Sequence, residues 1–342
     1  MATKPSGLKD CRSESLLRAG SAPASGDGFK VVAQTRRVST LYYLAGDAGT
    51  LQYWAAQTNG KHRRLIFSVD EGNGLIRPNR NGGWTPCCAR IYAFGREERN
   101  GARLIHIGVD GRGKETLPGR LPPSYDGDEV SQRSGRSVID EGLGASTHLV
   151  LMERNGTRRT IWSPPNGDVY GPDSPAISPS GTSIAFTTYD TNPWQPCNYP
   201  QLDVISSTGS GFHSIYQGQD QGRSPEDLSF SVQGGRMVFT DSVGISETCN
   251  VWPSNESRDI YLANTLGSGA RRITDTTLTD EEQPILNPQA TQIAFTTEQS
   301  GDLYIVPTGG GHPRHFAHLR ISAITPYVWL DTRWQRRKRV RH

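Results

Sequence analysis

Residues 175–186 read PAISPSGTSIAF, and residues 284–295 read PILNPQATQIAF. The two segments share a short apolar stretch, a turn that begins at proline, and an Ile-Ala-Phe stretch. Their alternation of apolar and polar residues is typical of strands that bury one face. Because the pattern returns about a hundred residues later, it indicates an internal repeat.

The repeating unit contains four predicted strands, which are all visible in residues 282–316 as EQPILN, QIAFTT, DLYIVPTGG and PRHF. The second strand recurs at 41–44, 90–94, 136–139, 183–186, 236–239 and 292–295. The third recurs at 51–54, 104–107, 148–152, 202–205, 259–262 and 302–306. A tight connection to the fourth strand needs a residue with positive φ, which glycine adopts without penalty. A glycine follows each third strand, at Gly60, Gly111, Gly156, Gly209, Gly267 and Gly309.

We therefore predict an all-β fold, a six-bladed β-propeller of four-stranded antiparallel blades. One such sheet cannot cover both of its faces, whereas six arranged radially cover one another. Residues 29–34 and 324–330 are both candidates for the strand that completes the first blade. We favour 324–330, which carries Trp329 and would join the two ends of the chain. A seventh, degenerate blade is the alternative.

The segments ISPSGTSIAF and DIYLANTLGSGARRIT resemble the repeat of TolB-like propellers, which are related to the WD type. In that family Trp-Ser-Pro-Asp-Gly, Ile-Ala-Phe, an Asp-Ile-Tyr-Val strand and Arg-Arg-Leu-Thr run through each blade. The resemblance covers about residues 30–331 and is clearest from 175 to 316, while the Ser-Pro-Asp-Gly turn is missing around 75–94. It implies a non-catalytic scaffold for protein–protein interaction, which accepts flexible segments at its channel mouth.

The chain divides into three predicted segments: a polar, flexible segment 1–28, the propeller 29–331 and a basic tail 332–342. Six cations and no acid lie in the last ten residues, at Arg333, Arg336, Arg337, Lys338, Arg339 and Arg341. Without these six the net charge of +3 would be −3. We interpret the tail first as a solvated chain end that keeps the protein soluble. The alternative is that the tail contacts nucleic acid or an anionic surface.

Residues 1–28 lack the apolar core of a secretory signal, and no apolar run is long enough to cross a membrane. The sequence therefore indicates a cytoplasmic location, whereas the family resemblance implies a periplasmic or extracellular one.

Sequence motifs of common enzymes, metal sites and nucleotide sites are absent, among them Gly-x-Ser-x-Gly, His-Glu-x-x-His, Cys-x-x-Cys and Gly-x-Gly-x-x-Gly. We therefore predict no catalytic residue and no cofactor, and a role in binding. Two alternatives stay open: a metal-dependent lactonase or sugar lyase of the propeller type, and a glycan-binding module. The predicted first strands offer Ser178, Ser229 and Asn287, which are poor metal ligands.

Acidic and basic residues fall in different loops. The turns between third and fourth strands are basic, and the connections that enter the first strands are acidic. Because first strands line a propeller's channel, we expect the acids to surround one channel mouth and attract a basic peptide or a divalent cation. The predicted binding residues are Asp128, Glu129, Asp173, Glu226, Asp227, Glu281 and Glu282. Alternatively, the acids only decorate exposed turns.

The two longest loops, 187–201 and 240–258, occupy equivalent places in adjacent predicted blades. Trp194, Tyr199 and Trp252 would form an aromatic contact surface for a partner, or else pack the loops against each other. Cys197 and Cys249 occupy matching places in the two loops. A disulfide between them would indicate an oxidising compartment, and the alternative is two free thiols.

Overall fold

A computed structural model describes residues 32–47, 50–70, 76–78, 90–97, 101–108, 115–116, 129–130, 136–142, 147–153, 155–165, 169–190, 200–218, 225–243, 257–276, 280–297, 302–317 and 323–338. Every regular element within these ranges is a β-strand, so the described part of the chain is all-β. It contains no helix that is long and apolar enough to cross a membrane.

The described strands form six antiparallel sheets of four strands, which we number from the N-terminus. The first contains β24 (Ala323–Lys338), β1 (Val32–Asp47), β2 (Thr50–Gln57) and β3 (Arg64–Asp70). The second contains β4 (Ile76–Pro78), β5 (Arg90–Glu97), β6 (Gly101–Gly108) and β7 (Glu115–Thr116). The third contains β8 (Glu129–Val130), β9 (Ser137–Glu141), β10 (His148–Met152) and β11 (Arg158–Trp162).

The three remaining sheets carry the clearest copies of the repeat. The fourth contains β12 (Val169–Ile177), β13 (Ser183–Asp190), β14 (Pro200–Ser206) and β15 (His213–Gln217). The fifth contains β16 (Glu226–Phe230), β17 (Arg236–Val243), β18 (Ser257–Asn264) and β19 (Gly267–Arg272). The sixth contains β20 (Glu281–Leu286), β21 (Gln292–Thr297), β22 (Leu303–Pro307) and β23 (Arg314–Ala317). Each predicted second and third strand overlaps an observed strand in that position, so these predictions are confirmed.

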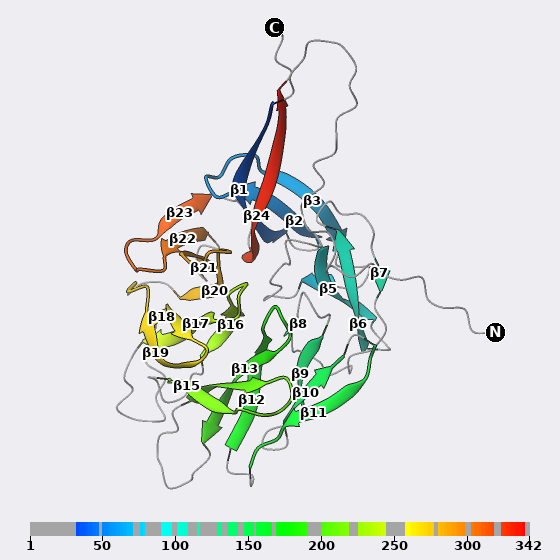
Figure 1. Cartoon of the computed structure of the whole chain (residues 1–342), viewed down its shortest axis with the longest axis vertical. Coiled ribbons are helices and arrows are strands. Elements are labelled where there is room, and N and C mark those ends of the chain that lie inside the picture. The colour runs from blue at the N-terminus through cyan, green and yellow to red at the C-terminus, as the bar shows by residue number, and fades with distance from the viewer. Residues whose placement is uncertain are drawn as a thin grey trace, which may run out of the picture.

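The sheets lie around a common centre (Figure 1). The first strands β16, β20 and β8 lie nearest that centre, and the fourth strands β19, β15, β11 and β7 lie on the outer side. Residues placed on the first strands of successive sheets therefore face a shared central region.

The Ile-Ala-Phe stretch divides its side chains between two neighbouring sheets. In the fourth sheet, Ile184 and Phe186 pack against the third sheet, whereas Ala185 packs against the fifth. Residues 293–295 repeat this division toward the fifth and first sheets. Two large side chains fill the gap on one side, and the small alanine lets the next sheet approach on the other. The repeated segment therefore encodes contacts between sheets as well as strands.

The sixth sheet packs against the first, so the last repeat returns to the beginning of the chain. Their shared buried cluster consists of Leu41, Tyr43, Ala56, Ile285, Ala294, Leu303, Ile305 and Phe316. Between the same sheets, a guanidinium nitrogen of Arg314 donates to the carbonyl oxygen of Thr58 at 3.2 Å.

The first and last described strands, β1 and β24, pair with each other. As predicted, the C-terminal strand supplies the first strand of the first sheet, with Trp329 opposite Leu41. Two boundaries differ from the prediction. Residues 332–338, expected as part of a tail, continue β24, and residues 32–34, one of the two candidate closing segments, belong to β1. Both segments are extended because each supplies the backbone partners of the other.

One turn glycine differs from the prediction. In the connections after β2 and β14, Gly60 and Gly209 have positive φ and donate to the carbonyl three residues earlier, as expected. In the sixth sheet Gly310, not Gly309, has φ of 88° and donates to Pro307. The run of three glycines at 309–311 hides this choice in the sequence, because any of them tolerates positive φ. Gly111 lies outside the described residues.

Candidate functional site

Three successive first strands share one backbone irregularity. In β12, β16 and β20 the pairing register with the second strand shifts after Asp173, Glu226 and Glu282. The residue that follows each acid has positive φ without being glycine: Ser174, Asp227 and Gln283, at 48°, 53° and 54°. Such bulges redirect side chains and recur beside functional sites. An equivalent backbone feature thus presents an acidic residue in three neighbouring sheets.

Arg258 contacts one of these acids, Glu226, and a further acid, Asp280. Its guanidinium forms an ion pair of 2.7 Å with Glu226, and its backbone N–H donates to Asp280 at 3.0 Å. Burial lowers the pKa of Arg258, but the hydrogen bond and charge of Glu226, together with the charges of Asp227 and Asp280, outweigh burial and raise it. The guanidinium is thus held in its charged form by several carboxylates.

Asp173 and Asp227 extend this group over three sheets. Asp173 accepts a hydrogen bond of 2.7 Å from the backbone N–H of Ser174. Desolvation raises the pKa of Asp173, and the nearby negative charge of Glu226 raises it further. Asp227 accepts the backbone N–H of Gln283 at 3.0 Å, which joins the fifth sheet to the sixth. We call Asp173, Glu226, Asp227 and Asp280 the inner acidic cluster.

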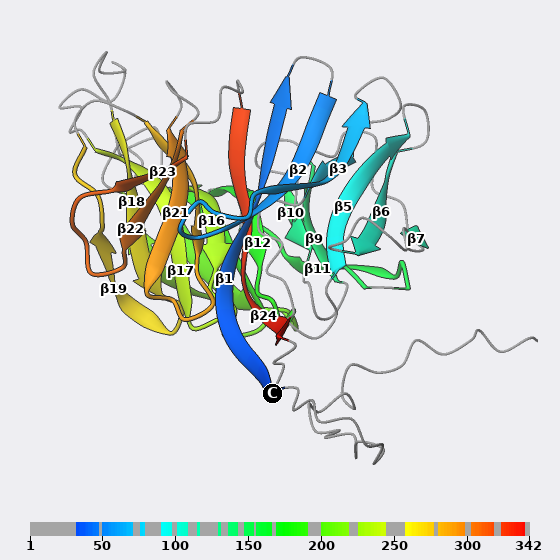
Figure 2. The same ribbon diagram turned by 90° about the horizontal axis from the view of Figure 1, so that it is seen from above.

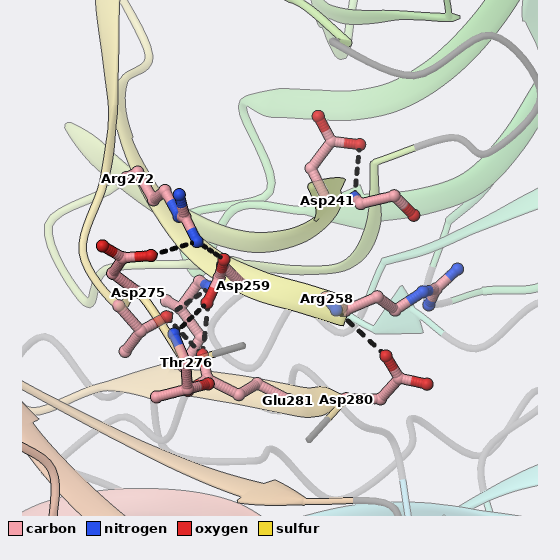
Figure 3. A network of polar contacts seen from close by, with 11 residues as sticks. Asp241, Arg258, Asp259, Arg272, Asp275, Thr276, Asp280 and Glu281 are labelled. Carbon is pink, nitrogen blue, oxygen red and sulfur yellow. Dashed lines mark hydrogen bonds and ion pairs between the residues drawn. The ribbon is translucent and has the colours of Figure 1, made fainter. Parts of the chain in front are cut away.

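Glu281 lies in a different environment from the cluster. Only 1% of it is exposed, and Figure 3 shows it among residues of the fifth sheet. Its carboxylate accepts bonds from the Ile260 N–H at 3.2 Å, from Thr276 Oγ1 at 2.9 Å and from Thr274 Oγ1. Burial raises its pKa to about 7 against these hydrogen bonds, and the charge of Asp259 adds to the rise. Glu281 therefore connects two sheets and presents no surface to a partner.

A third-strand aspartate forms a similar internal contact in three sheets. Asp259 is fully buried and forms an ion pair with Arg272, which also contacts Asp275 at 2.7 Å (Figure 3). Asp203 accepts bonds from Thr188 Oγ1 at 2.6 Å and from Ser214 Oγ. In the sixth sheet, Asp302 Oδ1 lies 3.5 Å from His315 Nε2. The Asp of the repeated Asp-Ile-Tyr motif thus anchors the fourth strand, a role that its recurrence alone could have signalled.

Basic residues of the fourth strands join sheets together. Arg159 donates to the carbonyl of Ser207 in the next sheet, and Arg271 does the same to Thr308. His213 occupies the equivalent place between the fourth and fifth sheets, with Nε2 3.3 Å from the carbonyl oxygen of Thr265. With Arg314, four fourth strands each place a basic residue against the following sheet. These four side chains are therefore partly committed to the fold.

The other predicted site residues are placed less completely. Glu282 is half-buried in β20, and Glu129 begins β8, where it pairs with Val138. The remaining predicted residues lie outside the described ranges: Asp128, Trp194, Tyr199, Trp252, Cys197 and Cys249. The disulfide between Cys197 and Cys249 therefore stays a prediction, and so does the aromatic contact surface of the two long loops. Within the described ranges, no three His, Cys, Asp or Glu side chains are grouped so that they could hold a metal ion.

Comparison with known proteins places the fold. No protein-family model matches the chain, and no curated protein is similar to it in sequence. Among solved structures, TolB from Acinetobacter baumannii superposes with a TM-score of 0.58 and 14% identity, over 85% of this chain and 66% of that one. A putative TolB from Agrobacterium tumefaciens gives a TM-score of 0.52 and 14% identity, over 82% of this chain and 89% of that one.

The fold is that of a TolB-like β-propeller. A chain of a nidogen/laminin complex is also similar, with a TM-score of 0.56 and 8% identity, over 85% of this chain and 98% of that one. These identities are too low to carry a ligand from one protein to another, because function depends on individual side chains at the site. The ligand of this TolB-like propeller therefore depends on the side chains that it carries itself.

Proposed function

We propose that this chain is a non-catalytic, six-bladed propeller scaffold that binds a basic, flexible segment of a partner protein at its inner acidic cluster. The six four-stranded sheets, the pairing of β24 with β1 and the packing of the sixth sheet on the first support a closed ring. Binding at the channel mouth suits a ring, because the first strands of all blades contribute to one opening.

The observation that carries the proposal is the imbalance of charge in the cluster. Among the described residues, the carboxylates of Glu226, Asp227 and Asp280 act on the Arg258 guanidinium, and a fourth carboxylate, that of Asp173, lies near Glu226. Burial is the main cause of the raised pKa of Asp173, and the nearby charge of Glu226 raises it further, because like charges held together make ionisation more costly. An incoming lysine or arginine would relieve this repulsion and form charge-assisted hydrogen bonds. The cluster is therefore suited to a cation on a mobile segment.

The test removes negative charge from the inner acidic cluster and keeps the shape of the replaced side chains. Asp173, Asp227 and Asp280 each accept a backbone N–H, and asparagine can accept the same bond. The triple variant D173N/D227N/D280N should therefore fold normally with three fewer negative charges. Glu281 is left unchanged, because it is buried between sheets.

The probe is a fluorescein-labelled peptide of alternating arginine and glycine, and the readout is its fluorescence anisotropy at low salt. We expect the triple variant to bind at least about tenfold more weakly, a loss of about 1.4 kcal/mol. A control variant, E141Q/E153Q/D275N, removes three acids that pair with Arg158, Arg136 and Arg272 away from the cluster. Equal weakening by both variants, or by neither, would reject the cluster as the binding site.

A further inference from the structure

The strands β1 and β24 continue beyond the sheet that they share. β2 pairs with β1 only from Thr40 onward, opposite Gln57. Before that point, residues 32–39 of β1 pair with residues 331–338 of β24. Figures 1 and 2 both show these paired ends projecting outside the ring of sheets. The first sheet thus extends into a two-stranded antiparallel ribbon.

Positive charge is concentrated on this ribbon. The seven successive pairs from Val32↔Lys338 to Val38↔Thr332 contain no acid. Their six cations are Arg36, Arg37, Arg333, Arg336, Arg337 and Lys338. At about 3.3 Å per residue, the six charges lie along only about 20 Å of ribbon. We call residues 32–38 and 332–338 the basic ribbon.

The register distributes the residues of the basic ribbon over two faces. Directly opposed residues share a face, and the face alternates along each strand. One face therefore holds the pairs Ala33↔Arg337, Thr35↔Gln335 and Arg37↔Arg333. This face combines three arginines with an amide, a hydroxyl and a methyl group, and it has no large apolar residue.

We propose that the basic ribbon binds double-stranded DNA. The major groove of B-form DNA is about 12 Å wide and admits a two-stranded β-ribbon. Arginine and lysine neutralise phosphates, while arginine, glutamine and threonine also hydrogen-bond to base edges. The positive charge, the two-stranded form and the residues of the arginine face therefore all favour double-stranded DNA as the partner.

Two other polyanions fit the ribbon less well. The major groove of an RNA duplex is deep and narrow, so it does not admit such an element. Binding to an anionic membrane is favoured by a continuous apolar face below the headgroups, and neither face of the ribbon provides one. The arginine face has no large apolar residue, and on the opposite face the pair Gln34↔Arg336 separates Val32 from Trp334 and Val38. The cations also protect an exposed edge against pairing with another chain, but that role predicts no affinity for DNA.

The experiment uses the full chain and a fluorescein-labelled DNA duplex of about 20 base pairs, followed by anisotropy over a series of salt concentrations. The variant R37Q/R333Q/R337Q removes three cations from one face of the ribbon. The slope of log K against log salt is negative, and each lost phosphate contact should make it shallower by about 0.9. The slope of the triple variant should therefore be shallower by about 3. At low salt we expect at least about a tenfold loss of affinity.

The matched control is K61Q/R63Q/R158Q, which removes three exposed cations from the ring: Lys61 and Arg63 before β3, and Arg158 at the start of β11. It should leave both the affinity and the salt slope of DNA binding unchanged. If the ribbon variant fails to fold, the single variants R37Q, R333Q and R337Q should each lower the slope by about 0.9.

Three results would overturn the proposal: no binding to DNA, equal weakening by the control, or stronger binding to an RNA duplex or to phosphatidylglycerol vesicles than to DNA. The site lies outside the inner acidic cluster, so peptide binding and DNA binding fail or succeed independently.

Discussion

The replacement Glu281→Gln should stabilise the protein at neutral and alkaline pH. The Glu281 carboxyl is buried between the fifth and sixth sheets, and its pKa is raised from 4.5 to about 7. The folded state therefore holds this proton more tightly than the unfolded state. Between about pH 4.5 and 7 the folded state binds more protons, so the free energy of unfolding falls as pH rises through this window.

The size of the effect follows from the shift. The pKa of Glu281 is higher in the folded than in the unfolded state by about 2.5, and one pH unit corresponds to about 1.4 kcal/mol. Once Glu281 is ionised in both states, its burial therefore lowers the free energy of unfolding by about 3 kcal/mol. Glutamine keeps the shape and stays neutral. Its oxygen can accept from Ile260 N–H and Thr274, while its amide can donate to Thr276 Oγ1. The variant should therefore match the native protein near pH 4.5 and exceed its stability by up to about 3 kcal/mol at pH 8.

Urea unfolding at several pH values between about 4.5 and 8 measures this difference. The control is Glu282→Gln, which removes the same charge from the adjacent, half-buried residue. Parallel pH profiles for the native protein and the Glu281 variant would refute the reasoning, because they would mean that this carboxyl does not titrate differently on folding.

Three further perturbations test the packing. Phe186→Ala should lower the free energy of unfolding by about 3–5 kcal/mol in a urea titration, because this ring is buried. Its centroid lies 5.1 Å from that of the Trp162 ring and 6.1 Å from that of the Phe212 ring. His213→Ala should cost about 1 kcal/mol through the lost contact with Thr265, while His213→Arg, the residue type in the equivalent contacts, should cost less. Truncation before Ala323 removes the partner strand of β1, and size-exclusion chromatography should then show aggregation, because an unpaired strand edge is exposed.

Strand positions could be read from the sequence, because the alternation of residues such as Ile184, Ala185 and Phe186 is a local signal that each repeat restates. The sequence also indicated the return of the C-terminal strand, since residues 324–330 match the first-strand pattern. The far end of that strand was missed, because six cations resemble a solvated tail until a partner strand is present.

The candidate site was predictable as a region and not residue by residue. Glu281 and Glu282 are identical neighbours in the sequence, yet one is almost fully buried and the other only half-buried. Their alternation on a strand could be expected, but which of them meets Thr274 and Thr276 depends on the neighbouring sheet. The sequence alone therefore determined the repeats, the strands and the sign of charge on each set of loops, which are local properties. Only the tertiary structure decided which charges join sheets and which stay available, because burial depends on residues that are distant in the chain.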